Sequence, residues 1–145
     1  MLQEKITQEI KSAMLQKNAE RLRGLRGIKA QLDLLNTLGK EVTSEMELSV
    51  LQKMVKQRKE SAEIFKNNGR TDLLEVELQE ISVIEEFLPK QMSREEIEAS
   101  VKEIVASLNA TSFKEMGKVM GVASKTLAGK ADNKIVSEVI KSLLS

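Results

Sequence analysis

The 145-residue sequence contains no histidine, cysteine, tryptophan or tyrosine, and its aromatic residues are three phenylalanines. Without histidine or cysteine, the chain cannot form a Ser-His or Cys-His nucleophile pair, a thiolate or imidazole zinc site, or a disulfide. With so few aromatic side chains, it also lacks the stacking platforms that bind single-stranded bases. The chemistry that remains is that of lysine, arginine, aspartate, glutamate, serine, threonine and the backbone.

The net charge of +1 conceals a segregation of charge along the chain. Basic residues concentrate in residues 11–29, 53–59 and 114–134, and acidic residues concentrate in residues 72–86. Such blocks indicate either a surface that presents positive charge or acidic and basic helices that pack side by side and neutralise each other. The balance as a whole is not typical of a strongly basic nucleic-acid binder.

Targeting and membrane segments are not visible in the sequence. No apolar stretch approaches the ~20 residues that span a membrane, and Glu4 and Lys5 place charges where a signal peptide would need an apolar run. The hydrophobic fraction of 41% is sufficient for a buried core. We therefore expect a soluble cytoplasmic protein that does not contact membranes.

Helical periodicity runs through the whole chain. Apolar residues recur three and four positions apart, Pro89 is the single proline, and no stretch shows sustained strand-like alternation. We predict an all-α fold, with four helices over about residues 2–17, 19–38, 44–67 and 71–87 and three more beginning near residues 93, 112 and 132. The sequence around Pro89 predicts a boundary between a four-helix domain, residues 1–92, and a three-helix domain, residues 93–145.

Helix-capping residues support these starts. Asn18 and Asp132 are suited to N-cap positions. Three serine–glutamate pairs have the spacing of a capping box: Ser44 with Glu47, Ser93 with Glu96, and Ser112 with Glu115.

Two pairs of glycines lie inside predicted helices, Gly24 with Gly27 and Gly117 with Gly121. Each interior glycine costs a helix about 1 kcal/mol relative to alanine. Either neighbouring helices approach closely at these positions, or the backbone of a partner or a phosphate does so. Lysines flank the second pair and favour the partner there.

A search for catalytic machinery finds none. The stretch 117–126 resembles a phosphate-binding loop, but Val119 and Ser124 stand where that motif needs glycine. No glycine-rich elbow presents a serine nucleophile, and the paired acids lie at helix ends, where acids are ordinary. We expect no catalytic residues, no metal and no cofactor.

Four blocks of sequence resemble the motifs of the GatB/YqeY family, and in particular its free-standing YqeY proteins. The matches follow the family's order over essentially the full chain. They are Leu25–Ala30 (LRGIKA), Lys56–Ser61 (KQRKES) with Phe65 and Gly69–Leu73, Glu85–Gln91 (EEFLPKQ), and Gly117–Gly121 (GKVMG) with Gly129–Asp132 (GKAD). Two departures are glycine at 24 and 27, where the family is usually bulkier, and Phe87 in place of a tyrosine.

The resemblance implies an all-α, two-part fold, a helical hairpin domain followed by a small three-helix domain. It also implies kinship with the tail of the GatB chain of aspartyl/glutamyl-tRNA amidotransferase. In that enzyme, the amidase chain hydrolyses glutamine, the main body of GatB activates the tRNA-bound carboxylate, and the tail helps to hold the tRNA. The family's label is carbon–nitrogen ligase activity with glutamine as amido donor. The present chain lacks the Ser-Ser-Lys machinery of the amidase, and it also lacks the catalytic body of GatB.

The resemblance and the basic blocks together predict a tRNA-binding accessory protein, whose partners are tRNA and amidotransferase or other translation-related proteins. Structured RNA is recognised largely through phosphate and 2′-OH contacts, which need basic side chains and few aromatics. The candidate RNA-binding residues are Lys118, Lys125, Lys130 and Lys134, with Lys56, Lys59 and Arg70 as a second group; Gly117, Gly121 and Gly129 are candidate structural glycines.

Arg58 lies on the opposite side of its helix from Lys56 and Lys59, and is expected to pair with an acid of the helix over 71–87. The alternative function is a non-catalytic protein-interaction, or scaffolding, module.

Overall fold

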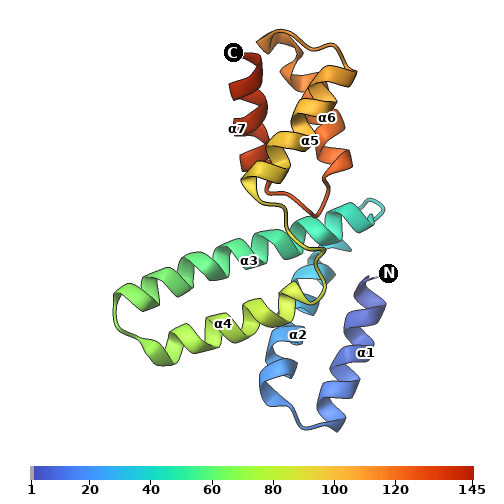
Figure 1. The fold of residues 1–145 in the computed structure, drawn as a ribbon. Helices are drawn as coiled ribbons and strands as arrows, with labels where there is room; N and C mark the ends of the chain where they lie inside the picture. The colour runs from blue at the N-terminus through green and yellow to red at the C-terminus, as the bar shows by residue number, and fades with distance from the viewer. Residues whose placement is uncertain (1) are drawn as a thin grey trace. The chain divides into compact units, whose positions relative to one another are not determined.

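The computed structural model describes residues 2–145 and confirms the all-α prediction (Figure 1). Within these residues there are seven α-helices, one short 3₁₀-helix and no strand. The α-helices are α1 (Leu2–Leu15), α2 (Ala19–Leu35), α3 (Ser44–Asn67), α4 (Thr71–Glu85), α5 (Arg94–Ser107), α6 (Met116–Thr126) and α7 (Asn133–Leu144); the 3₁₀-helix η1 is Phe113–Glu115. None of the described helices combines the length and apolar character that a membrane crossing requires.

The chain forms two compact units, and each has its own hydrophobic core. The first unit ends at Pro89 and the second comprises Lys90–Ser145. The sequence predicts the division slightly further along, between residues 92 and 93. The buried apolar residues of each unit form a cluster of their own, which contains no residue of the other unit.

In the first unit, α1 packs on α2, α2 packs on α4, and α3 and α4 form a long antiparallel hairpin (Figure 1). The interior contains Ile6, Leu25, Ile28, Leu51 and Ile84, all at most 1% exposed. These residues come from the predicted apolar stripes, because a helical stripe three and four residues apart faces one side. The hairpin turns at Gly69, whose φ of +69° is a conformation that glycine adopts readily.

In the second unit, α5, α6 and α7 pack around a core that includes Ile97, Val101, Val119 and Ile140. The side-chain amide of Gln91 donates to the carbonyl oxygen of Gly129 at 2.7 Å. The backbone N–H of Met92 donates to the carbonyl oxygen of Lys130 at 2.8 Å. These two hydrogen bonds tie the start of the unit to the loop between α6 and α7.

Three of the predicted helix caps are confirmed. The side chain of Asn18 accepts a hydrogen bond from the backbone N–H of Arg21. Ser93 and Glu96 form a reciprocal capping box at the start of α5. Asp132 caps α7 by accepting from the backbone N–H of Lys134 at 2.9 Å.

The other two predicted capping boxes are wrong. Thr43 is the N-cap of α3 and accepts from the backbone N–H of Met46. Glu47 lies one position too late for this cap, and its side chain is buried on the inner face of the helix. Ser112 makes no side-chain cap bond; the Glu115 carboxylate instead accepts from the backbone N–H of Thr111, and the turn η1 precedes α6.

Three helices end earlier than predicted: α1 at Leu15, α2 at Leu35 and α4 at Glu85. Short turns with bonds between residues three apart follow these ends, as at Lys17, Leu38 and Leu88.

Candidate nucleic-acid interface

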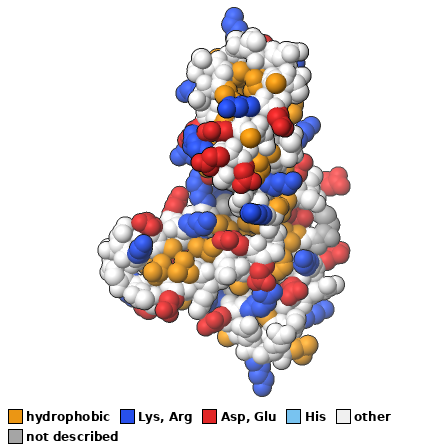
Figure 2. All heavy atoms as spheres, viewed as in Figure 1, with side chains coloured by type: hydrophobic (Ala, Val, Ile, Leu, Met, Phe, Trp, Pro, Cys, Tyr) orange, Lys and Arg blue, Asp and Glu red, His pale blue; other side chains and the backbone are white. Residues whose placement is uncertain are grey.

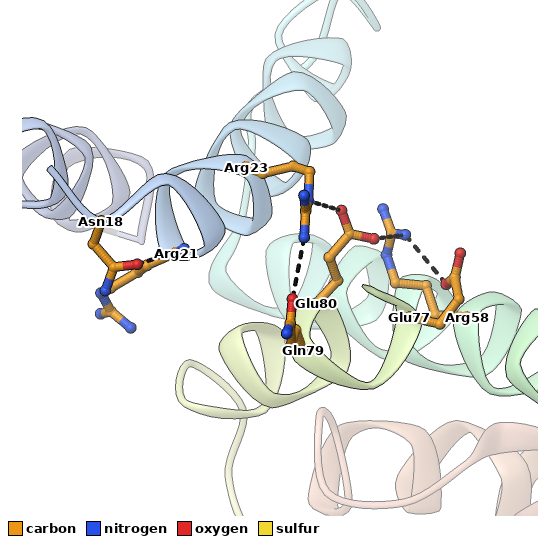
Figure 3. Close-up of polar contacts among 7 residues, drawn as sticks. All are labelled: Asn18, Arg21, Arg23, Arg58, Glu77, Gln79 and Glu80. Atoms are coloured by element: carbon orange, nitrogen blue, oxygen red, sulfur yellow. Dashed lines mark hydrogen bonds and ion pairs between the residues drawn. The ribbon is translucent and has the colours of Figure 1, made fainter. Parts of the chain in front are cut away.

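An ionic cluster joins α2, α3 and α4 in the first unit (Figure 3). The Glu80 carboxylate is only 8% exposed and lies between two guanidinium groups. Arg23 Nε is 3.4 Å from Glu80 Oε1, and Arg58 Nη1 contacts Glu80 Oε2. Arg58 Nη1 also lies 3.4 Å from Glu77, so the prediction that Arg58 pairs with an acid of the helix over 71–87 is confirmed.

A second arginine bridge joins α1, α2 and the end of α4. Arg21 donates to Glu86 at 2.6 Å and to Glu9 at 3.1 Å. The hydrogen bond to Glu86, together with the bond to Glu9, raises the pKa of the Arg21 guanidinium. In this unit Arg21, Arg23 and Arg58 therefore neutralise acids within the fold, as expected where acidic and basic helices pack together. Arg26 is exposed and forms no ion pair with a described residue.

The second group of candidate RNA-binding residues, Lys56, Lys59 and Arg70, includes both paired and unpaired side chains. Lys56 and Lys59 are exposed on α3 and form no ion pair with any residue from 2 to 145. Arg70 is bound to Asp72, with Nη2 3.2 Å from the carboxylate, and this hydrogen bond raises the pKa of Arg70. Lys56 and Lys59 are thus the cations of this group that remain available to a partner.

The first group of candidates lies in the second unit, along α6 and the start of α7. Lys118 and Lys125 are two turns apart on one exposed face of α6, Lys130 lies in the loop after that helix, and Lys134 lies in the first turn of α7. All four side chains are exposed, and over the described part of the chain none is in an ion pair.

Three acids lie within one turn of these lysines along the chain, and each has another partner. Glu115 accepts from the N–H of Thr111, Asp132 accepts from the N–H of Lys134, and Glu138 pairs with Arg94. None of the three forms an ion pair with Lys118, Lys125, Lys130 or Lys134 among the described residues. On the face shown in Figure 2, basic and acidic side chains are interspersed.

The glycine pairs have different surroundings. A Cβ at Gly24 would lie 3.1 Å from Val83 Cβ, which confirms the close helix approach there. At Gly117 and Gly121, no described atom lies within 4 Å of a Cβ position, and both residues are exposed. The packing explanation therefore fails for this second pair. Gly129 is buried in the turn before α7 with a φ of +75°.

The chemistry at this surface of the second unit is that of exposed lysine side chains. In residues 2–145, no group of three or more histidine, cysteine, aspartate or glutamate side chains is placed to hold a metal ion. What the second unit presents is a set of unneutralised ammonium groups beside an exposed stretch of helix backbone.

Sequence reasoning missed two features. It did not find the bridge between Arg23 and Glu80, because no local pattern relates residues so far apart in the chain. It also missed a groove between α2 and α3, which depends on how these helices diverge. The sequence feature that lies near this groove is the glycine pair, because Gly27 is one of the lining residues.

Comparison with known proteins identifies the relatives of the chain. The family model described as "Yqey-like protein" matches residues 3–144. A protein of Pyrenophora tritici-repentis named "Altered inheritance of mitochondria protein 41, mitochondrial" is 29% identical over 140 residues, which cover 94% of this chain and 77% of that protein. A protein of the same name from Kluyveromyces lactis is 32% identical over 132 residues, 86% of this chain and 71% of its own length.

These names overturn one prediction from the sequence. The relatives are named as mitochondrial proteins, so the expectation of a cytoplasmic protein is wrong. The reasoning failed because composition does not set the compartment of a folded domain. Targeting segments set it, and these are read separately and often removed.

Proposed function

The chain belongs to the YqeY-like protein family, and from this premise we propose that it is a non-catalytic tRNA-binding accessory protein related to the tRNA amidotransferases. The second unit resembles the tail that helps to hold tRNA in the large enzyme. Under this proposal, the amidotransferase complex carries out the carbon–nitrogen ligase reaction for which the family is labelled, and the present chain assists that complex.

The observation that supports this proposal is the group Lys118, Lys125, Lys130 and Lys134. Each is exposed, and within the described residues none is neutralised by a carboxylate. A lysine that meets an RNA phosphate releases condensed counterions, and this release supplies much of the affinity. Such lysines are therefore more useful to an RNA partner than Arg21 and Arg58 of the first unit, which are already paired.

The exposed glycines give this group a second property. Gly117 and Gly121 lie on α6 beside Lys118 and Lys125, with no described atom within 4 Å of their Cβ positions. Each costs helix stability of about 1 kcal/mol relative to alanine. We infer that an RNA backbone approaches the helix here, because a side chain at either position would keep it further away.

The experiment is a filter-binding titration with total tRNA over a series of salt concentrations. The variant carries Lys118→Glu and Lys130→Glu together. We expect weaker binding, and a salt slope reduced by about one for each phosphate that the variant no longer neutralises.

The matched control carries Lys11→Glu and Lys102→Glu, which make the same change in net charge at exposed, unpaired lysines outside the group. Equal binding by the two double variants would show that only net charge matters. An affinity and slope that stay at the wild-type values in the first variant would overturn the proposed interface.

A further inference from the structure

A continuous groove runs between α2 and α3 in the first unit. One part has a volume of about 300 Å³ and the next about 220 Å³. The two parts share three lining residues, Gln31, Met54 and Gln57. The two parts therefore adjoin, and together they follow α2 from Gly27 to beyond its end. It lies outside the lysines of the proposed RNA interface.

The two ends of the groove differ in chemistry. One end is lined by Leu34, Leu35, Leu38 and Val50, and Leu34 and Leu38 are 57% and 55% exposed. The other end is polar and is lined by Gly27, Arg58, Ser61 and Glu77. Leucines this exposed beside a groove are typical of surfaces that bind an apolar partner.

Arg58 has an unused edge at the polar end. Its Nη1 is engaged by Glu77 and Glu80. Its Nε is buried and has no hydrogen-bond partner among the described residues. Its Nη2 lies 3.6 Å from the position that a Cβ of Gly27 would occupy, so this edge of the guanidinium borders the groove. A buried donor without a partner is costly, and an acceptor entering at Gly27 would find a guanidinium with donors to spare.

The charge of the lining favours an acidic partner. Lys53 lies at the apolar end, is exposed and forms no ion pair with a described residue. Glu77 is the acid of the lining; it shares Arg58 with Glu80, and Arg23 is the second cation of this cluster, so the cluster carries no net charge. A carboxylate on the partner would therefore meet the ammonium group of Lys53 at the apolar end and a guanidinium donor without a partner at the polar end.

We propose that this groove binds an amphipathic helix of a partner protein, with apolar side chains against Leu34 and Leu38 and one carboxylate at Arg58. From Gly27 to Leu38 the groove extends roughly 16 Å at the helical rise of about 1.5 Å per residue, which is about three turns of a partner helix. Helices bound in such grooves present apolar anchors three and four residues apart. Gly27 admits the partner's backbone closely, because it carries no side chain.

The test uses synthetic helical peptides of about four turns as probes. Each carries leucines spaced three and four residues apart and a single glutamate one turn beyond them, placed before the leucines in one peptide and after them in the other. A third peptide replaces the glutamate with lysine. Fluorescence anisotropy measures affinity, and amide chemical-shift changes in the full-length ¹⁵N-labelled protein locate the bound peptide.

We expect one glutamate peptide to shift the amides of Gly27, Gln31, Met54 and Gln57 and to bind about tenfold more tightly than the lysine peptide. Leu34→Asp should weaken that binding about tenfold or more, because it removes an apolar anchor. Leu15→Asp is the matched control, since Leu15 is 86% exposed on α1 and outside the groove. Gly27→Leu should block the polar end, and circular dichroism shows whether this variant folds.

Any of three results with the peptides would overturn the proposal: no binding by either glutamate peptide at millimolar concentration, equal binding by the lysine peptide, or equal losses in Leu34→Asp and Leu15→Asp. Binding of tRNA that shifts the groove amides would assign the groove to nucleic acid and would also overturn it. The proposed RNA interface is tested by different residues, so either proposal can fail alone.

Discussion

Gly24 and Gly27 lie one turn apart on α2, and the same substitution should have opposite effects at the two positions. At Gly24 a new Cβ would lie 3.1 Å from Val83 Cβ and 3.2 Å from both Val83 Cγ atoms. At Gly27 the nearest atom is Arg58 Nη2 at 3.6 Å, an ordinary van der Waals contact with the end of a flexible side chain. We therefore predict that Gly24→Ala destabilises the first unit and that Gly27→Ala stabilises it.

The magnitudes follow from two terms. Both variants gain about 1 kcal/mol, because alanine is the better helix former. Gly24→Ala also loses about 1–3 kcal/mol through overpacking. Val83 cannot relieve this contact by rotating, since its β-branched side chain has one preferred rotamer in a helix and its Cβ is fixed to the backbone of α4. The two variants should differ by the overpacking term alone, about 1–3 kcal/mol.

The assay is thermal and urea unfolding followed by far-ultraviolet circular dichroism, because the chain has no tryptophan or tyrosine for fluorescence. For a unit of this size, 1 kcal/mol corresponds to about 4–8 °C in Tm. Gly27→Ala should melt above the wild type, and Gly24→Ala should melt at least ~4 °C below Gly27→Ala. Equal melting temperatures for the two variants would refute the reasoning, since they would show that α4 moves away without cost.

Two further predictions concern charged groups. Glu80→Gln should lower the free energy of unfolding by about 2 kcal/mol. Breaking a fully buried ion pair costs about 3–5 kcal/mol, and the loss is smaller here because Arg23 is partly solvated. A urea midpoint no lower than that of the exposed control Glu75→Gln would contradict this prediction. The hydrogen bond from the Ser93 backbone N–H lowers the pKa of Glu96 below its ordinary value of 4.5. The stability that Glu96 contributes is therefore present above pH 4.5 and is lost as the pH falls through the lowered pKa. Glu96→Gln should remove this part of the acid dependence of unfolding, and an unchanged pH profile would contradict the capping-box explanation.

The sequence predicts those parts of the fold that local interactions determine. Asn18, Ser93 and Asp132 each bond to a backbone N–H two or three residues away, so a short motif contains the whole interaction. Glu47 shows the limit of this reasoning. Its spacing from Ser44 fits a cap, but its side chain is buried on the inner face of α3, and nothing local signals that choice.

Some features of the candidate site could likewise be predicted from local sequence, and others could not. Helical spacing was enough to predict that Arg58 turns away from Lys56 and Lys59 towards an acid of α4. Sequence could not tell that Asp72 would hold Arg70, or that Gly24 faces Val83 while Gly117 and Gly121 face open space. A contact across the tertiary structure, with Val83, distinguishes Gly24 from the other glycines, whereas the pair of Arg70 and Asp72 is local and depends on the side-chain conformations at the start of α4.

The two separate cores have a consequence for how the protein can change. No buried apolar residue of the first core belongs to the second, and the effects of substitutions that share no packing partner add. A destabilising change around Val119 or Ile140 should therefore leave the packing around Leu25 and Leu51 intact. The second unit can therefore vary its exposed lysines, such as Lys118 and Lys130, without changing the buried core of the first unit.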